Sequence, residues 1–276
     1  MIWLGFLALV QAEPCEDYGR PQLLLRLRTN ELLESSGLAA SRVQDGRFFT
    51  HNDSGSAPVL FSFSTDGGAV KSWPLSIDAY DLEDMASGPC PGGGNCFYVG
   101  DIGDNARIRE SIQIYAFRET ETGAEPDPMA VWDLRYPSPA QDAESLLVNP
   151  VNGSIYVVTK RSQGAQVFRA PKSPGEGVFS LVAELSPEKM GFKMPKLTGG
   201  DFSREGNRVV LRGYLSAWEW VVDPQKSEAH WLGAPQRKVS LRLERQGEAI
   251  TYDLTDRIFT SSEGLPMPLT RIGCSR

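Results

Sequence analysis

The stretch FYVGDIGDN, residues 97–105, combines an apolar run with side chains that can bind a ligand. Asp101, Asp104 and Asn105 supply oxygen and nitrogen atoms, and two glycines supply a flexible backbone. A tight turn needs only one Gly and one Asn or Asp. The excess predicts a functional loop that directly follows a buried strand.

Acidic residues begin several similar segments elsewhere in the chain. The candidate metal ligands are Ser36, Glu83, Glu144 and Glu248, with Gly200 and Asp201 in the corresponding place of the fourth segment. Converging carboxylates repel one another unless a cation or protons neutralise them. Oxygen ligands suit calcium better than a transition metal. The pattern predicts one calcium ion, with Ser36 or water completing its shell. A polar network that braces the strands is the alternative.

Basic and polar side chains follow the second strand of each predicted unit. The candidate ligand-binding residues are Asn105, Arg107, Lys160, Arg161, Arg212, Tyr214 and Glu263. A cation together with arginines can hold a phosphate or carboxylate group. This set predicts a small anionic ligand, or else a protein partner. In the alternative, Lys160 and Arg212 only neutralise the converging glutamates.

Four residues are candidates for a general base. They are His51, Asp53, Asp101 and Asp104. A histidine next to a carboxylate can act as a base, and a hydrogen-bonded structural histidine is the alternative. No G-x-S-x-G elbow is present, which argues against a serine hydrolase of that type. The glycines of CPGGGNC lack the Lys and Ser or Thr of a phosphate-binding loop.

Five similar units must position these residues. Each begins with a polar patch and an apolar strand, continues through a turn to a second strong strand, and then reaches a third. The units begin at ESSGLAAS (34–41), DLEDMAS (81–87), DAESLLVNP (142–150), LTGGDFS (197–203) and QGEAITYD (246–253). Weaker fourth strands are expected at 70–76, 130–136, 180–186 and 229–235. The fifth unit ends before a fourth strand.

This repetition predicts an all-β fold, a β-propeller of five four-stranded blades. Six blades, one of them degenerate, is the alternative. PQLLLRLRT at residues 21–29 supplies the missing outer strand of the last blade and closes the ring. Because the first two strands of a blade are antiparallel, the start of one lies beside the end of the other. The polar patches should therefore meet on one face, around the axis.

The ends of the chain and its four cysteines predict export. Residues 1–12 are expected to be a signal peptide, and residues 13–276 a single propeller domain in a secreted or periplasmic protein. Cys90 should pair with Cys96, and Cys15 with Cys274, with free thiols as the alternative. No later stretch is long enough to span a bilayer. The net charge of −7 argues against nucleic acid as a partner, and we expect a monomer.

The segments ESSGLA, FTHNDSG, LEDMA, DAESLL and GEAITY resemble two propeller groups with one acidic residue per blade. One is the secreted calcium-activated nucleotidase (apyrase) family, and the other is the phytase-like and esterase-like propellers of exported bacterial proteins. The resemblance implies an axial calcium held by Glu83, Glu144 and Glu248, and it puts Asp53 in a rim loop. The sequence departs from the apyrase pattern at SGSAP, where that family has nucleotide contacts.

Two functions follow from the sequence and the resemblance. One is a calcium-dependent hydrolase of a phosphorylated or esterified small molecule. The other is a non-catalytic propeller that binds a ligand or a protein, with an axial ion or polar network that only stabilises the ring. Fold alone does not choose between them.

Overall fold

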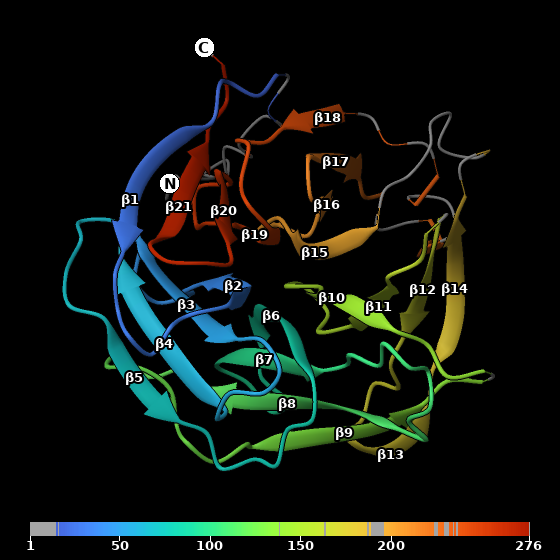
Figure 1. Cartoon of the computed structure of the whole chain (residues 1–276). Coiled ribbons are helices and arrows are strands. Elements are labelled where there is room, and N and C mark those ends of the chain that lie inside the picture. The colour runs from blue at the N-terminus through green and yellow to red at the C-terminus, as the bar shows by residue number, and fades with distance from the viewer. Residues whose placement is uncertain are drawn as a thin grey trace, which may run out of the picture.

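Five sheets surround a central axis in the computed structural model, in which each sheet is one blade of a β-propeller (Figure 1). The structure describes Cys15 and residues 17–137, 139–162, 164–186, 188, 196–223, 226–228, 232–233, 235 and 237–275. The predicted signal peptide lies outside these residues. Among the residues described, no helix has the length and apolar character needed to cross a membrane.

Each blade is built from consecutive antiparallel strands. Blade one contains β2 (Ser35–Ala40), β3 (Arg47–Asn52), β4 (Val59–Ser64) and β5 (Lys71–Pro74). Blade two contains β6 (Leu82–Pro89), β7 (Asn95–Asp101), β8 (Ile112–Arg118) and β9 (Ala130–Arg135). Blade three contains β10 (Ala143–Val148), β11 (Ile155–Thr159), β12 (Ala165–Arg169) and β14 (Ser180–Leu185).

The last two blades complete the ring. Blade four contains β15 (Leu197–Phe202), β16 (Arg208–Gly213), β17 (Ser216–Val221) and β18 (Arg237–Ser240). Blade five contains β19 (Gly247–Tyr252), β20 (Ile258–Ser262), β21 (Met267–Ile272) and β1 (Gln22–Leu27). Each innermost strand contacts the innermost strands of both neighbouring blades, including β19 with β2. The prediction of five blades is confirmed, and the six-blade alternative is wrong.

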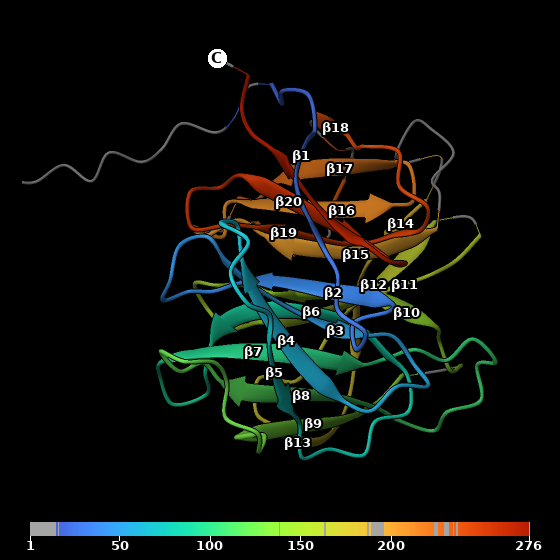
Figure 2. The same cartoon turned by 60° about the vertical axis from the view of Figure 1, so that its left-hand side comes forward.

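The N-terminal strand closes blade five, as the sequence predicts. β1 pairs antiparallel with β21, with Leu27 opposite Met267. Cys15 and Cys274 form a disulfide beside this pair, and the Gly19 amide donates a 2.8 Å hydrogen bond to the Gly273 carbonyl. In Figure 2, β1 passes in front of the other strands of blade five, of which it is the outermost strand. The second predicted disulfide, Cys90–Cys96, is also present.

Aromatic residues on the second strands join neighbouring blades. Successive side chains of a strand point to opposite faces, so Phe48 and Phe49 of β3 face different blades. The Phe48 ring lies 4.5 Å from that of Phe259 in blade five, and the Phe49 ring lies 4.0 Å from that of Phe97 in blade two, centroid to centroid. The alternation of side chains along these strands therefore builds the packing between blades.

Two details differ from the sequence prediction. A short strand, β13 (Gly175–Val178), pairs in parallel with β9 and gives blade two a fifth strand. The outer strand of blade four is β18 at residues 237–240. The sequence prediction placed it at residues 229–235, of which 229–231 and 234 lie outside the described residues. Gly233, in that earlier segment, accepts a 2.8 Å hydrogen bond from the indole Nε1 of Trp220, and the neighbouring Leu232 packs into the core.

Candidate functional site

A β-bulge recurs at the same position in all five innermost strands. The register shifts by one residue near the start of β2, β6, β10, β15 and β19. Such a bulge leaves one residue unpaired and redirects its side chain. The residues at this position are Ser36, Glu83, Glu144, Thr198 and Glu248. Four of them are the predicted metal ligands.

The fourth blade differs from the sequence prediction at this position. Thr198, rather than Gly200 and Asp201, occupies the bulge. Asp201 is instead turned toward blade five, where its Oδ2 accepts hydrogen bonds from the Thr251 hydroxyl at 2.7 Å and the Tyr252 amide at 2.9 Å. The prediction was therefore misplaced by two to three residues along β15.

In blades one, two, three and five, a second polar layer lies two residues before the bulge. At this position, a main-chain amide just after the second strand donates a hydrogen bond to a main-chain carbonyl just before the first strand. The pairs are Asp53 with Glu34 at 2.9 Å, Gly103 with Asp81 at 3.2 Å, Lys160 with Asp142 at 2.9 Å and Glu263 with Gln246 at 3.0 Å. The polar residues that start first strands and end second strands therefore meet on one face, as predicted.

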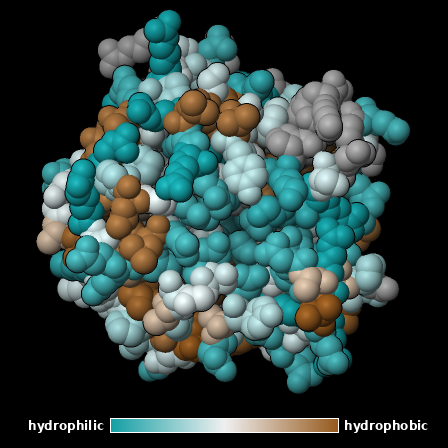
Figure 3. All heavy atoms as spheres, viewed as in Figure 1, coloured by the Kyte–Doolittle hydropathy of each residue, from teal (hydrophilic) through white to brown (hydrophobic). Residues whose placement is uncertain are grey.

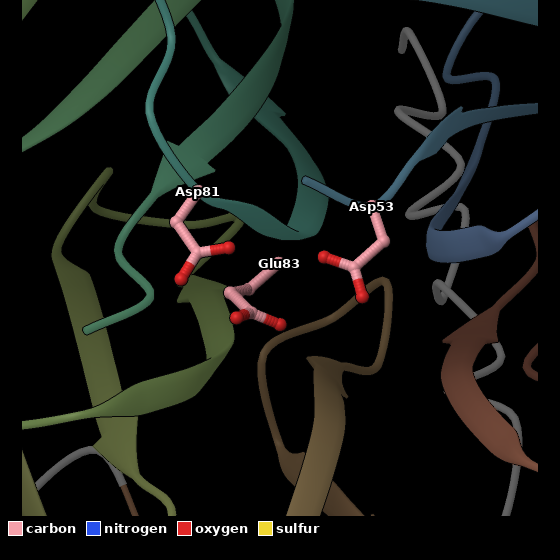
Figure 4. A group of neighbouring side chains, drawn as sticks. All are labelled: Asp53, Asp81 and Glu83. Carbon is pink, nitrogen blue, oxygen red and sulfur yellow. The ribbon is translucent and has the colours of Figure 1, made fainter. Parts of the chain in front are cut away.

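Five carboxylates gather where these two layers meet. Asp53, Asp81 and Glu83 offer oxygen atoms that all lie within 4.8 Å of one another, and their carboxylates converge in Figure 4. Glu83, Asp142 and Glu144 form a second group with the same property. Glu83 belongs to both groups. We call these five residues the axial carboxylate cluster. Four of them are buried, and only Asp53 is partly exposed.

The axial carboxylate cluster concentrates negative charge in a buried place. Burial, followed by the charges of Glu144, Asp53 and Asp81, raises the pKa of Glu83 to about 11. Burial also raises the pKa of Glu144, even though Lys160 acts in the opposite direction. In this surrounding Glu83 holds a proton at neutral pH unless a cation takes its place.

A glycine provides the space for the two central carboxylates. A Cβ atom on Gly103 would lie 2.3 Å from Oε1 of Glu83 and 2.4 Å from Oδ2 of Asp81. Both distances are far below ordinary contact, so any other residue at this position would push the carboxylates apart. The second glycine of the GDIGDN loop therefore lets the acidic groups approach the backbone.

One described ammonium group contacts the cluster. Lys160 forms an ion pair with Glu144, and it lies 6.0 Å from the ring centroid of Tyr214. Glu144 and, less strongly, Tyr214 and Glu248 favour its charged form, and its pKa is raised. A single lysine can neutralise only one of the five carboxylates. If salt bridges alone replaced the metal, protonation would have to neutralise most of the remaining negative charge.

Glu248 and Ser36 lie outside the two carboxylate groups. Glu248 has a buried Oε2 atom without a hydrogen-bond partner among the described residues, and burial raises its pKa. The Ser36 hydroxyl donates to the main-chain carbonyl of Glu83. Ser36 therefore fixes the backbone at Glu83. The two carboxylate groups include Asp81 and Asp142, which the sequence prediction did not name as ligands.

The residue after the bulge of blade two links three innermost strands. Asp84 in β6 accepts hydrogen bonds from the amides of Leu146 at 3.0 Å and Gly200 at 3.4 Å. These bonds tie together the innermost strands of blades two, three and four. Asp84 is fully buried, and burial raises its pKa well above the ordinary value. The corresponding residues of the other blades are Gly37, Ser145, Gly199 and Ala249.

The two candidate bases in the GDIGDN loop have structural contacts. Asp101 accepts a 2.8 Å hydrogen bond from the amide of Asp81 and forms a 2.8 Å ion pair with Arg109. Asp104 accepts hydrogen bonds from the amides of Ile108 and Arg109 at 3.0 and 2.9 Å. Both carboxylates are buried and engaged. They hold the loop that carries Gly103, and Asp101 also fixes the backbone of Asp81 just before β6, which makes both of them positioning residues.

The candidate base His51 lies deeper than Asp53. Its side chain is fully buried, its Nδ1 donates to the carbonyl of Asn52 at 2.8 Å, and burial lowers its pKa. A Cβ atom on Gly37 would lie 2.6 Å from Nε2. His51 is therefore a neutral histidine packed against β2, while Asp53 reaches the axial carboxylate cluster.

The predicted ligand-binding residues separate into exposed and buried groups. Asn105 and Arg107 are exposed in the rim loop, and Tyr214 is partly exposed beside Lys160. Arg161 donates to Gln141 and Gln166. Arg212 is fully buried, forms a 3.1 Å ion pair with Glu244 and donates to the carbonyls of Ala249 and Ser261 at 3.0 and 3.2 Å. Arg212 thus joins blades four and five away from solvent.

Glu263 directly follows β20 in the fifth blade and is partly exposed. It accepts a 2.7 Å hydrogen bond from Gln246, and burial together with Glu248 and Asp53 raises its pKa to about 7. Hydrophilic side chains also gather over the centre of the ring on the face seen in Figure 3. Hydrophobic side chains form separate patches farther from that centre.

Comparisons with known proteins identify the fold alone. The sequence matches no protein-family model and no curated protein. The soluble aldose sugar dehydrogenase from Escherichia coli has a TM-score of 0.51 and 9% identity, over 93% of this chain and 99% of that one. An auxiliary nutrient binding protein from Bacteroides thetaiotaomicron VPI-5482 has a TM-score of 0.51 and 9% identity, over 92% and 76%.

A streptogramin B lyase has a TM-score of 0.47 and 10% identity, over 96% of this chain and 100% of that one. The sugar dehydrogenase and the nutrient binding protein, both with a TM-score of 0.51, support a β-propeller. The comparisons do not show the resemblance to the apyrase family or to the phytase-like propellers.

Proposed function

We propose that this protein binds one divalent cation, calcium, in the axial carboxylate cluster and uses it to bind a small anionic ligand. The observation that carries the proposal is the pair of carboxylate groups that share Glu83 and close around the bare backbone of Gly103. Buried carboxylates of this kind must be protonated, paired or bound to a metal. Among the described residues Lys160 pairs with Glu144, and no basic side chain forms an ion pair with the other four carboxylates.

The donor set fits calcium. All five residues of the cluster offer carboxylate oxygens, the ligands that calcium prefers, and calcium tolerates an irregular shell that water completes. A soft metal would call for sulfur or imidazole ligands, and His51 is turned toward Asn52. When bound, calcium would supply positive charge that attracts an anionic oxygen of the ligand. Asp53, which is partly exposed, marks the side from which a ligand can approach.

Hydrolysis of a phosphorylated or esterified ligand is a second candidate function. It is favoured by Glu263, whose pKa of about 7 suits proton transfer near neutral pH. Glu263 lies partly exposed on the same rim, where it can donate or accept a proton at its carboxylate. The names of the structural neighbours include both a sugar dehydrogenase and a nutrient binding protein, so propellers serve catalysis as well as binding. Fold does not choose between them.

Export is part of the proposal. Two disulfides, Cys15–Cys274 and Cys90–Cys96, support an oxidising compartment such as the periplasm or the outside of the cell.

The experiment is a calcium titration by isothermal calorimetry after chelator has been removed. We expect one calcium per chain, and we expect Glu83→Gln to abolish the heat of binding. Glu205→Gln, which changes an exposed glutamate outside the cluster, should bind like the wild type. A wild type that releases no heat and keeps no calcium after dialysis would overturn the metal assignment. Nitrophenyl esters and phosphates, assayed with and without calcium, then test hydrolysis.

A further inference from the structure

A second pocket lies beside blade five, apart from the axial carboxylate cluster. It is a cavity of about 170 Å³ between the β18–β19 loop, the β20–β21 loop and β1. The residues that matter for its chemistry are Arg26, Arg242, Leu243, Arg245, Glu263 and Leu265. We call this cavity the arginine pocket.

Three guanidinium groups line the arginine pocket without a described acidic partner. Arg26 comes from β1, and Arg242 and Arg245 come from the loop before β19. None of the three forms an ion pair within the described part of the chain. The excess of positive charge contrasts with the net charge of −7 of the whole chain.

Each of the two acids that line the pocket, Glu244 and Glu263, has a hydrogen-bonding partner outside the three arginines. Glu244 is held by Arg212 at 3.1 Å on Oε2 and by the Thr260 hydroxyl at 3.0 Å on Oε1. Glu263 accepts a hydrogen bond from Gln246 at the edge of the pocket. The three guanidiniums are therefore free to bind an anion. Guanidinium forks bind phosphate oxygens in pairs, which gives both affinity and orientation.

The remaining wall of the arginine pocket is apolar. Leu243 is 82% exposed and Leu265 is 49% exposed, and both line the cavity together with Pro266 and Pro268. Large exposed apolar side chains beside a pocket mark a place where a ligand covers them. The cavity volume equals that of roughly five or six water molecules in the liquid. This is room for a phosphate group with the near part of an attached ring.

We propose that the arginine pocket binds a phosphomonoester with an apolar substituent, such as an aryl phosphate. The phosphate contacts Arg26, Arg242 and Arg245, and the substituent covers Leu243 and Leu265. This site goes beyond the proposed calcium-dependent function, because none of its arginines belongs to the axial carboxylate cluster. Binding therefore does not require the cation.

The experiment is a titration of phenyl phosphate by isothermal calorimetry, with chelator present throughout. We expect saturable binding at one site per chain, and about a tenfold or greater loss of affinity for Arg242→Ala and for Arg245→Ala. Leu243→Ser should weaken phenyl phosphate but leave inorganic phosphate unchanged, which separates the two walls. Arg20→Ala, an exposed arginine outside the pocket, is the matched control.

Further measurements with variants and with lipid vesicles separate this proposal from the calcium assignment and from membrane binding. Glu83→Gln should bind phenyl phosphate like the wild type, so failure of the calcium assignment leaves this test intact. Absence of saturable binding to the wild type, or equal binding by the triple variant of Arg26, Arg242 and Arg245 to Ala, overturns the proposal. Binding to vesicles of anionic lipid without binding to phenyl phosphate also overturns it and assigns the patch to a membrane surface.

Discussion

Replacing Glu83 with glutamine should remove both the pH dependence and the calcium response of stability that the axial carboxylate cluster confers. In the chelated protein, burial and neighbouring carboxylates hold the pKa of Glu83 at about 11, against 4.5 for a free glutamate. Between these values the folded state binds one proton more than the unfolded state. Because stability rises with pH only where the unfolded state binds more protons, it must fall here as pH rises.

The magnitude follows from the size of that window. One extra proton corresponds to about 1.4 kcal/mol for each pH unit. Between pH 5 and pH 8, the chelated wild type should therefore lose up to about 4 kcal/mol from Glu83 alone. Calcium replaces the proton, and at a hundredfold excess over its dissociation constant it should restore about 2.7 kcal/mol. Glu83→Gln carries no charge, so its stability should change much less with pH and not respond to calcium.

The assay is urea unfolding followed by tryptophan fluorescence at pH 5, 6.5 and 8, with chelator or with calcium. Wild type, Glu83→Gln and the surface control Glu205→Gln are measured side by side. Equal stability of the chelated wild type at pH 5 and pH 8 would refute the raised pKa of Glu83. A full calcium response in Glu83→Gln would refute the role of Glu83 as a calcium ligand.

Three other predictions concern the backbone that supports the site. Gly103→Ala should lower the unfolding free energy by about 1–3 kcal/mol and weaken calcium binding, because its Cβ would meet Glu83 and Asp81; unchanged calorimetric affinity would contradict this. Deleting residues 21–29 removes β1 and exposes the edge of β21, so the protein should no longer melt in a single cooperative transition. A truncated chain that melts like the wild type would disprove the role of β1. Cys274→Ser opens a loop of 259 residues and should cost about 5 kcal/mol in the chain-entropy description; an unaltered urea midpoint would rule that out.

The sequence predicts the ring because the fold repeats. Five similar units give the number of blades, and the missing fourth strand of the last unit identifies residues 21–29 as its partner. The packing of Phe48 and Phe49 against two neighbouring blades was not predicted, because it depends on which blades the two faces of β3 meet. β13 could not be predicted, because Gly175–Val178 contains two glycines and pairs with a strand some forty residues earlier.

The candidate site is predicted less completely. Glu83 and Glu144 follow from the repeat, whereas Asp81 and Asp142 were missed as members of the cluster. A signal for them is present: D-x-E occurs at the start of both units, as DLE and DAE. Residues two apart on a strand share a face. The engagement of Asp101 by Arg109 depends on side-chain contacts that no local pattern encodes. The same holds for the burial of Arg212 against Glu244.

The most direct test of the central claim is a crystal structure of the protein grown with calcium, in which anomalous differences locate the ion. We expect one anomalous peak on the axis, at about 2.3–2.6 Å from an oxygen of Glu83 and from oxygens of Asp81 or Asp142. This expectation is contradicted if no peak is present and the ammonium of Lys160 lies among the carboxylates instead.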